Sequence, residues 1–129
     1  MFNWRRPTHL GARDGRLAPC KRSPNCVSSQ ADPADREHYV APIAFRGAMA
    51  QLRKAVESME RSSVITAEAS YLYAEYRSRL LGYVDDLELL YDETAGLVHV
   101  RSASRLGRRD FGVNRKRVEA LRAIIQARR

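Results

Sequence analysis

The clearest hydrophobic pattern in the chain is helical and lies in residues 47–60. Apolar side chains recur there every three or four positions, as at Leu52, Val56 and Met59, and charged residues such as Arg53 fall between them. This spacing predicts an amphipathic helix. A second stripe of the same kind predicts a closing helix near the C-terminus; it consists of Val118, Leu121, Ile124 and Ile125.

Between these two helices the pattern changes to alternation, which is typical of strands. In residues 71–80, Leu72 and Tyr76 alternate with Tyr73 and Arg77. Short connections favour antiparallel neighbours, and residues 92–96 have the composition of a turn. The other segments with strand character are residues 64–69, 83–91 and 97–102.

Two helices and about four strands predict an α+β fold. Packing both helices on one face of an antiparallel sheet would bury both apolar stripes and form a two-layer sandwich. Asn114 is the expected N-cap of the closing helix. All 5 prolines lie before residue 43, in a stretch without a sustained apolar period. We therefore expect a flexible, irregular N-terminal arm over residues 1–16 and a single α+β domain over residues 17–129.

The charged residues are unevenly distributed along the chain. The net charge of +8 is concentrated at the ends, because residues 1–30 and 101–129 are basic and residues 31–100 are acidic. Such ends attract anions but identify no partner. No apolar run is long enough to span a membrane or to act as a secretory signal, so we expect a soluble, cytoplasmic protein without a membrane span.

The two cysteines, Cys20 and Cys26, are compatible with more than one role. They are a candidate redox pair that forms a disulfide when oxidised, and the alternative is that they are buried or loop-anchoring thiols. The three histidines do not stand at zinc-site spacings relative to them, so no metal site is predicted. No cofactor is predicted either.

Three motifs in order carry a family resemblance. They are Cys-Lys-Arg-Ser-Pro-Asn-Cys-Val-Ser-Ser-Gln at 20–30, Gly-Tyr-Val-Asp-Asp-Leu-Glu at 82–88, and Val-Arg-Ser-Ala-Ser-Arg-Leu-Gly at 100–107 followed by residues 110–119. Together they resemble the domain-of-unknown-function family 1499 over residues 17–125. The resemblance implies the domain but no biochemical activity. Basic Lys21 and Arg22 depart from the family pattern, which affects the charge around the cysteines.

The last strand and the start of the closing helix bring polar residues together. Guanidinium groups, hydroxyls and backbone N–H groups at a helix start are the parts of a phosphate or carboxylate site. In the alternative, structural interpretation, Arg101 or Arg105 pairs with a nearby acid, Asp85, Asp86 or Asp110, to fix the corner. The candidate ligand-binding residues are Arg101, Ser102, Ser104, Arg105, Asp110, Asn114, Arg115 and Asp86.

Alternation also decides which polar residues of a strand can act together. Asp86 and Glu88 fall on one face and Asp85 on the other. The first two support an alternative function, a small enzyme in which Asp86 or Glu88 acts as acid/base and the arginines bind an anionic substrate. The tyrosines of residues 71–76 are split between the faces in the same way, which disfavours base stacking and a nucleic-acid partner.

The sequence therefore favours a noncatalytic ligand-binding or interaction module. Its expected partner is a small anionic ligand or an acidic protein surface at the corner between the last strand and the closing helix. The glycine spacings fit neither a Walker nor a dinucleotide motif. Whether the protein is an enzyme stays open at this point, and no feature of the sequence indicates an oligomeric state.

Overall fold

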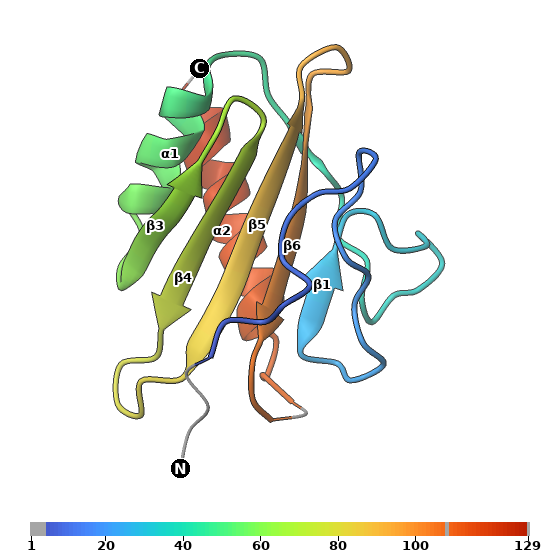
Figure 1. The fold of residues 1–129 in the computed structure, drawn as a ribbon, viewed down its shortest axis with the longest axis vertical. Coiled ribbons are helices and arrows are strands. Elements are labelled where there is room, and N and C mark those ends of the chain that lie inside the picture. The colour runs from blue at the N-terminus through green and yellow to red at the C-terminus, as the bar shows by residue number, and fades with distance from the viewer. Residues whose placement is uncertain (1–4, 108, 129) are drawn as a thin grey trace.

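The computed structural model describes residues 5–107 and 109–128, which form one sheet and two helices (Figure 1). Two short strands precede the first helix, and four longer strands lie between the two helices. In chain order the elements are β1 (Cys26–Ser28), β2 (Ile43–Ala44), α1 (Met49–Glu57), β3 (Ser62–Ala67), β4 (Tyr71–Arg77), β5 (Val84–Asp92), β6 (Leu97–Ser104) and α2 (Val113–Ala127).

The strands form an antiparallel sheet in the order β1-β6-β5-β4-β3, and β2 pairs with β6 beyond the end of β1. The prediction of an α+β chain with an antiparallel sheet and two helices is confirmed. The prediction of about four strands is wrong, because the sheet has six. β1 and β2 have only 3 and 2 residues, which is too short to show alternation, and pairing with β6 holds them in place.

The hydrophobic core lies between the sheet and the helices, both of which lie behind the sheet in Figure 1. Leu52 and Val56 of α1 and Val118 and Leu121 of α2 are completely buried, so the helical stripes point where the sequence pattern indicates. Burying one such side chain contributes roughly 1.5–3 kcal/mol. Truncating Leu52 to alanine would also leave a cavity, at a total cost of roughly 2–5 kcal/mol.

The opposite face of the sheet is polar, and the N-terminal segment, residues 5–19, covers the part of it that β5 and β6 form (Figure 1). Arg6 donates to Glu75 at 2.7 Å, and the backbone N–H of Gly11 donates to Glu88 at 2.7 Å. The flexible arm expected over residues 1–16 stays a prediction, and residues 1–4 of it lie outside the described residues.

Cys20 and Cys26 form a disulfide that ties the end of this segment to the first residue of β1. A redox role for the pair stays a prediction. Within the described ranges, no helix has the length and apolar character needed to cross a membrane. The same residues contain no cluster of 3 or more histidine, cysteine or acidic side chains placed to hold a metal ion.

Candidate functional site

The candidate ligand-binding residues lie on both faces of the sheet, because neighbours along a strand point in opposite directions. In β6, Ser102 contacts α2, whereas Arg101 contacts the N-terminal segment. Arg115 lies apart from both groups and donates to the carbonyl of Tyr39 at 2.8 Å. The helix side holds Ser102, Ser104, Asp110 and Asn114, and the other side holds Asp86, Arg101 and Arg105.

Asn114 is the centre of the helix-side group and is completely buried. Its Oδ1 accepts a hydrogen bond from Ser102 Oγ at 2.6 Å. Its Nδ2 donates to Ser104 Oγ at 2.9 Å and to Asp110 Oδ2 at 2.8 Å. Both polar atoms of the amide are therefore engaged inside the protein, as buried amides require. The helix-side group joins β6 to α2.

The N-terminus of α2 is capped differently from the sequence prediction. Gly112, with φ of 78°, occupies the N-cap position, so the prediction of Asn114 as N-cap is wrong. Asp110 accepts the backbone N–H groups of Gly112 at 2.9 Å and Asn114 at 3.1 Å. Burial opposes ionisation of Asp110, but these hydrogen bonds and the one from the Asn114 side chain lower its pKa. This carboxylate takes the place that an anion would occupy at a helix start.

On the other face, Arg105 lies between two buried carboxylates. It donates to Asp86 through Nε at 2.9 Å and Nη2 at 2.8 Å, and to Glu75 through Nη2 at 2.6 Å. Tyr73 donates a further hydrogen bond to Asp86. The structural interpretation of an Arg105–Asp86 pair is therefore confirmed. Burial opposes ionisation of Glu75, yet its bonds from Arg6, Tyr73 and Arg105 lower its pKa to about 2.

Arg101 is as buried as Arg105 but is much less well paired. Its side chain is 4 % exposed, and its nearest acidic atom is Glu88 Oε1, 3.9 Å from Nη1. Its Nη2 reaches the Pro19 carbonyl only at 3.4 Å. Burial lowers the pKa of Arg101, and the charge of Glu88 offsets this only in part. A guanidinium taken out of water needs short, directed acceptors, and Arg101 has few of them.

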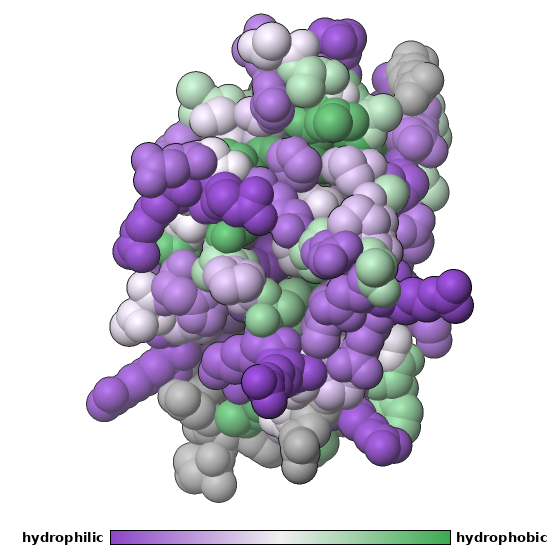
Figure 2. Space-filling model, turned by 90° about the vertical axis from the view of Figure 1, so that its right-hand side faces the viewer, coloured by the Kyte–Doolittle hydropathy of each residue, from purple (hydrophilic) through white to green (hydrophobic). Residues whose placement is uncertain are grey.

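A hollow of about 520 Å³ opens beside Arg101, between the sheet and the N-terminal segment. The side of the molecule that carries β1 has a mostly hydrophilic surface (Figure 2). Three parts of the chain line the hollow: the N-terminal segment, the loop between Cys20 and Cys26, and the sheet with the turn after β6. Its polar lining includes Arg6, His9, Lys21, Asn25, Asp86, Arg101, Ser104 and Arg105.

Unpaired buried atoms gather at this hollow. Among the described residues, the buried side-chain atoms without a hydrogen-bond partner are His9 Nε2, Glu88 Oε1 and Arg101 Nε. His9 and Arg101 line the hollow, and Glu88 faces Arg101. Burial lowers the pKa of His9, and the charge of Arg101 lowers it further. Unsatisfied buried groups are rare in proteins, and two of these three belong to side chains that line the hollow.

Four lining residues were not predicted from the sequence: Arg6 and His9 of the N-terminal segment, and Lys21 and Asn25 between the two cysteines. No period or motif marks Arg6 and His9, and their position depends on how the segment crosses the sheet. The basic excess of residues 1–30 was the available signal, since it placed positive charge in this segment. The disulfide then fixes where Lys21 lies relative to β1.

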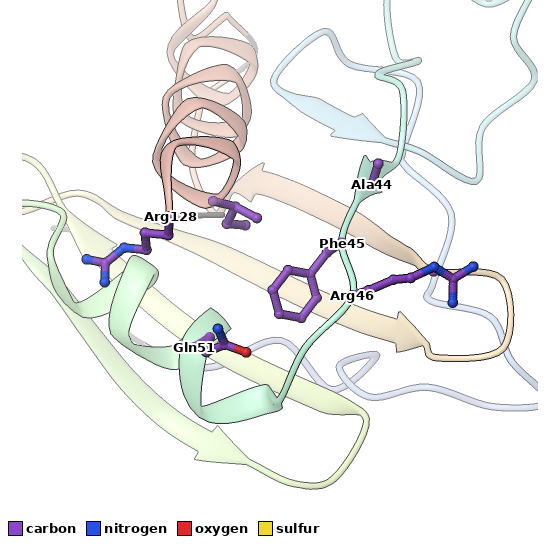
Figure 3. A pocket seen from close by; sticks show the side chains of 7 residues that line it. Ala44, Phe45, Arg46, Gln51 and Arg128 are labelled. Atoms are coloured by element: carbon purple, nitrogen blue, oxygen red, sulfur yellow. The ribbon is translucent and has the colours of Figure 1, made fainter.

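A second hollow, of about 380 Å³, lies near α1 and the end of α2 (Figure 3). Phe45 points into it, and Arg46 is directed away from it (Figure 3). Phe45 packs edge-on against Tyr91, and the Gln51 side chain accepts the backbone N–H of Ala48 at 2.8 Å. These groups hold the start of α1. None of the described residues that line this hollow has a buried side-chain atom without a hydrogen-bond partner, as Arg101 has.

The family model described as "Protein of unknown function (DUF1499)" matches residues 16–125. The resemblance expected from the three sequence motifs is therefore confirmed. The matched range includes Lys21, Arg101 and Arg105, whereas Arg6 and His9 precede it. The comparisons found no matching curated protein and no matching solved structure.

Proposed function

Because the chain belongs to the DUF1499 family, whose description names no activity, we propose a function from the site itself: noncatalytic binding of a small anion in the hollow beside Arg101. The observation that carries the proposal is the buried guanidinium of Arg101, whose Nε has no partner among the described residues. A phosphate or carboxylate oxygen would accept from this Nε and add to the countercharge that Glu88 supplies only in part.

The charge of the lining supports an anion. Its described residues include five cationic side chains, Arg5, Arg6, Lys21, Arg101 and Arg105, and one carboxylate, Asp86. Asp86 is already held by Arg105, and the acid nearest to Arg101 is Glu88 at 3.9 Å, which compensates its charge only in part. Inside a partly closed hollow the attraction between opposite charges is stronger than in bulk water.

The size of the hollow favours a small molecule over an acidic protein surface. A volume of about 520 Å³ lies within the range of roughly 300–1,000 Å³ that is typical of small-molecule sites. In this proposal the two helices stiffen the sheet from behind, in a two-layer sandwich. The protein acts in the cytoplasm, where Cys20 and Cys26 would be a redox pair, since permanent disulfides are disfavoured there.

The alternative, a small enzyme with Asp86 or Glu88 as acid/base, receives less support. Both oxygens of Asp86 accept hydrogen bonds from Arg105, and one also accepts from Tyr73. Glu88 is completely buried and accepts from Gly11 at 2.7 Å. An acid/base has to exchange a proton with a substrate, and both carboxylates are buried and engaged in hydrogen bonds within the protein.

Thermal unfolding with inorganic phosphate tests the proposal, with sodium chloride used to keep the ionic strength constant. Phosphate at about ten times its Kd will raise Tm by roughly 5 °C, since only the folded state offers the site. The Arg101→Gln variant will lose this shift. Lys21→Gln will reduce it, and this exposed position carries no risk to folding.

Arg53→Gln is the matched control, because Arg53 lies on α1 and pairs with Glu57 at the surface. It will keep the full phosphate shift. The proposal is wrong if phosphate gives no shift in the wild type, or if Arg101→Gln and Lys21→Gln respond to phosphate as strongly as Arg53→Gln does.

A further inference from the structure

Exposed apolar side chains gather at one end of the molecule, which we call the loop end. It consists of the β4–β5 loop, residues 78–83, the described residues 106, 107 and 109–112 of the β6–α2 loop, and Val113, the first residue of α2. Both loops lie at the lower end of the view in Figure 1. Leu80 is 91 % exposed and Phe111 is 88 % exposed, and Leu81 and Val113 are also exposed. A water-soluble surface rarely presents such side chains together.

A hollow of about 750 Å³ lies between these loops. Tyr76, Tyr83, Phe111 and Val113 contribute apolar surface to its lining. The hollow is distinct from the one beside Arg101 and shares with it only the end of β6 and the following turn. An apolar lining and exposed loop tips at the same end indicate a surface that contacts a partner.

The charge around the loop end is positive. The basic residues that line the hollow are Arg61, Arg77, Arg109, Lys116 and Arg117. Its acids are occupied within the protein, since Asp85 pairs with Arg117 at 2.9 Å, Glu60 with Arg61 at 3.1 Å, and Asp110 caps α2. These pairs also engage Arg61 and Arg117, so the positive charge offered to a partner is mainly that of the exposed Arg109 and Lys116. The loop end therefore complements a partner that is both apolar and anionic.

We propose that the loop end docks on an anionic lipid bilayer. Leu80 and Phe111 enter the boundary between headgroups and acyl chains, and Arg109 and Lys116 contact lipid phosphates. Apolar side chains flanked by Lys and Arg are the pattern that binds membrane interfaces. A bilayer fits better than a folded protein, because side chains on two separate loop tips can enter a soft, planar surface without a matching cleft.

Co-sedimentation with lipid vesicles tests the proposal on the full chain. The protein will bind vesicles of phosphatidylcholine mixed with phosphatidylglycerol, and it will bind phosphatidylcholine vesicles much more weakly. High salt will weaken the binding, because it screens the charges. Replacing Leu80 and Phe111 together by serine will reduce the partition coefficient more than tenfold, since two large apolar side chains no longer leave water.

The charge contribution is tested by Arg109→Gln together with Lys116→Gln. Each lost charge lowers binding about fivefold, so the double variant will bind roughly 25-fold more weakly. Ile65→Ser and Lys54→Gln are the matched controls, because Ile65 lies on β3 and Lys54 on α1, both outside the lining of the hollow. Both controls will bind like the wild type, as will Arg101→Gln, which tests the anion site separately.

Three outcomes would overturn the proposal. The first is that no vesicle composition sediments the protein. The second is vesicle binding that the Leu80 and Phe111 substitutions leave unchanged. The binding would then be a nonspecific attraction between charges. The third is a concentration-dependent self-association of the wild type, seen by sedimentation velocity and abolished by these substitutions, without vesicle binding. That result would assign the loop end to a second copy of the chain.

Discussion

Replacing Glu75 by glutamine will remove a large, pH-dependent part of the stability of the fold. In the folded protein the pKa of Glu75 is about 2, against an ordinary value of 4.5, although burial alone would raise it. The cause is the set of hydrogen bonds from Arg6, Tyr73 and Arg105. A difference of this size corresponds to about 3 kcal/mol. Because Arg6 is half exposed, solvent screening reduces its share, and we expect about 2 kcal/mol.

The sign of this contribution fixes its pH range. A carboxyl group whose pKa is lowered by folding stabilises the protein above its unfolded pKa, here 4.5, and loses this effect as the pH falls toward 2. Urea denaturation of Glu75→Gln and the wild type at several pH values measures it. The difference in unfolding free energy will be largest at neutral pH and will shrink below pH 4.5.

Glu57→Gln is the control for this experiment, because Glu57 forms an exposed pair with Arg53. Its loss will be at most about 1 kcal/mol. If Glu75→Gln costs no more than Glu57→Gln at neutral pH, or if its cost does not change with pH, then the Glu75–Arg105 pair does not stabilise the fold as described.

Three further predictions concern neighbouring elements. Asn114→Ala will cost roughly 2–4 kcal/mol in urea denaturation, because buried partners such as Ser102 Oγ lose their bonds; a cost under about 1 kcal/mol would contradict this. Burial opposes protonation of His38, but Asp35 and the Ser23 carbonyl raise its pKa. His38→Gln will therefore be destabilising below pH 6.5 and less so as the pH rises, and a constant cost would refute this. Reducing the disulfide will lower stability by about 2 kcal/mol, measured as a drop in Tm with dithiothreitol; an unchanged Tm would count against it.

The sequence predicted the elements whose periods are long enough to read. The alternation from Tyr71 marks the start of β4, and the stripe containing Leu52 and Val56 marks α1. β1 and β2 could not be predicted, because their pairing with β6 depends on residues more than 50 positions away. Asn114 is a favourable N-cap residue, but the turn made by Asp110 and the left-handed Gly112 starts α2 earlier.

The parity of the strands predicted which polar residues share a face. Asp86 and Glu88 both lie under the N-terminal segment, while Asp85 pairs with Arg117 of α2 on the other side. The same rule separates Ser102 from Arg101, so the candidate ligand-binding residues predicted at the junction of β6 and α2 lie on two faces of the sheet. How well each arginine is paired could not be predicted, since it depends on the distances from Arg101 and Arg105 to acids on the neighbouring strands.

The most direct test of the anion site follows the side-chain N–H groups of individual arginines by NMR during a titration with inorganic phosphate at constant ionic strength. The Arg101 Nε–H resonance will move and saturate, because this donor has no partner in the described protein and its side chain lines the hollow. The Arg105 resonance will stay in place, since Asp86 holds its Nε at 2.9 Å. A stationary Arg101 resonance, or equal and unsaturated shifts of all arginines, would contradict the account.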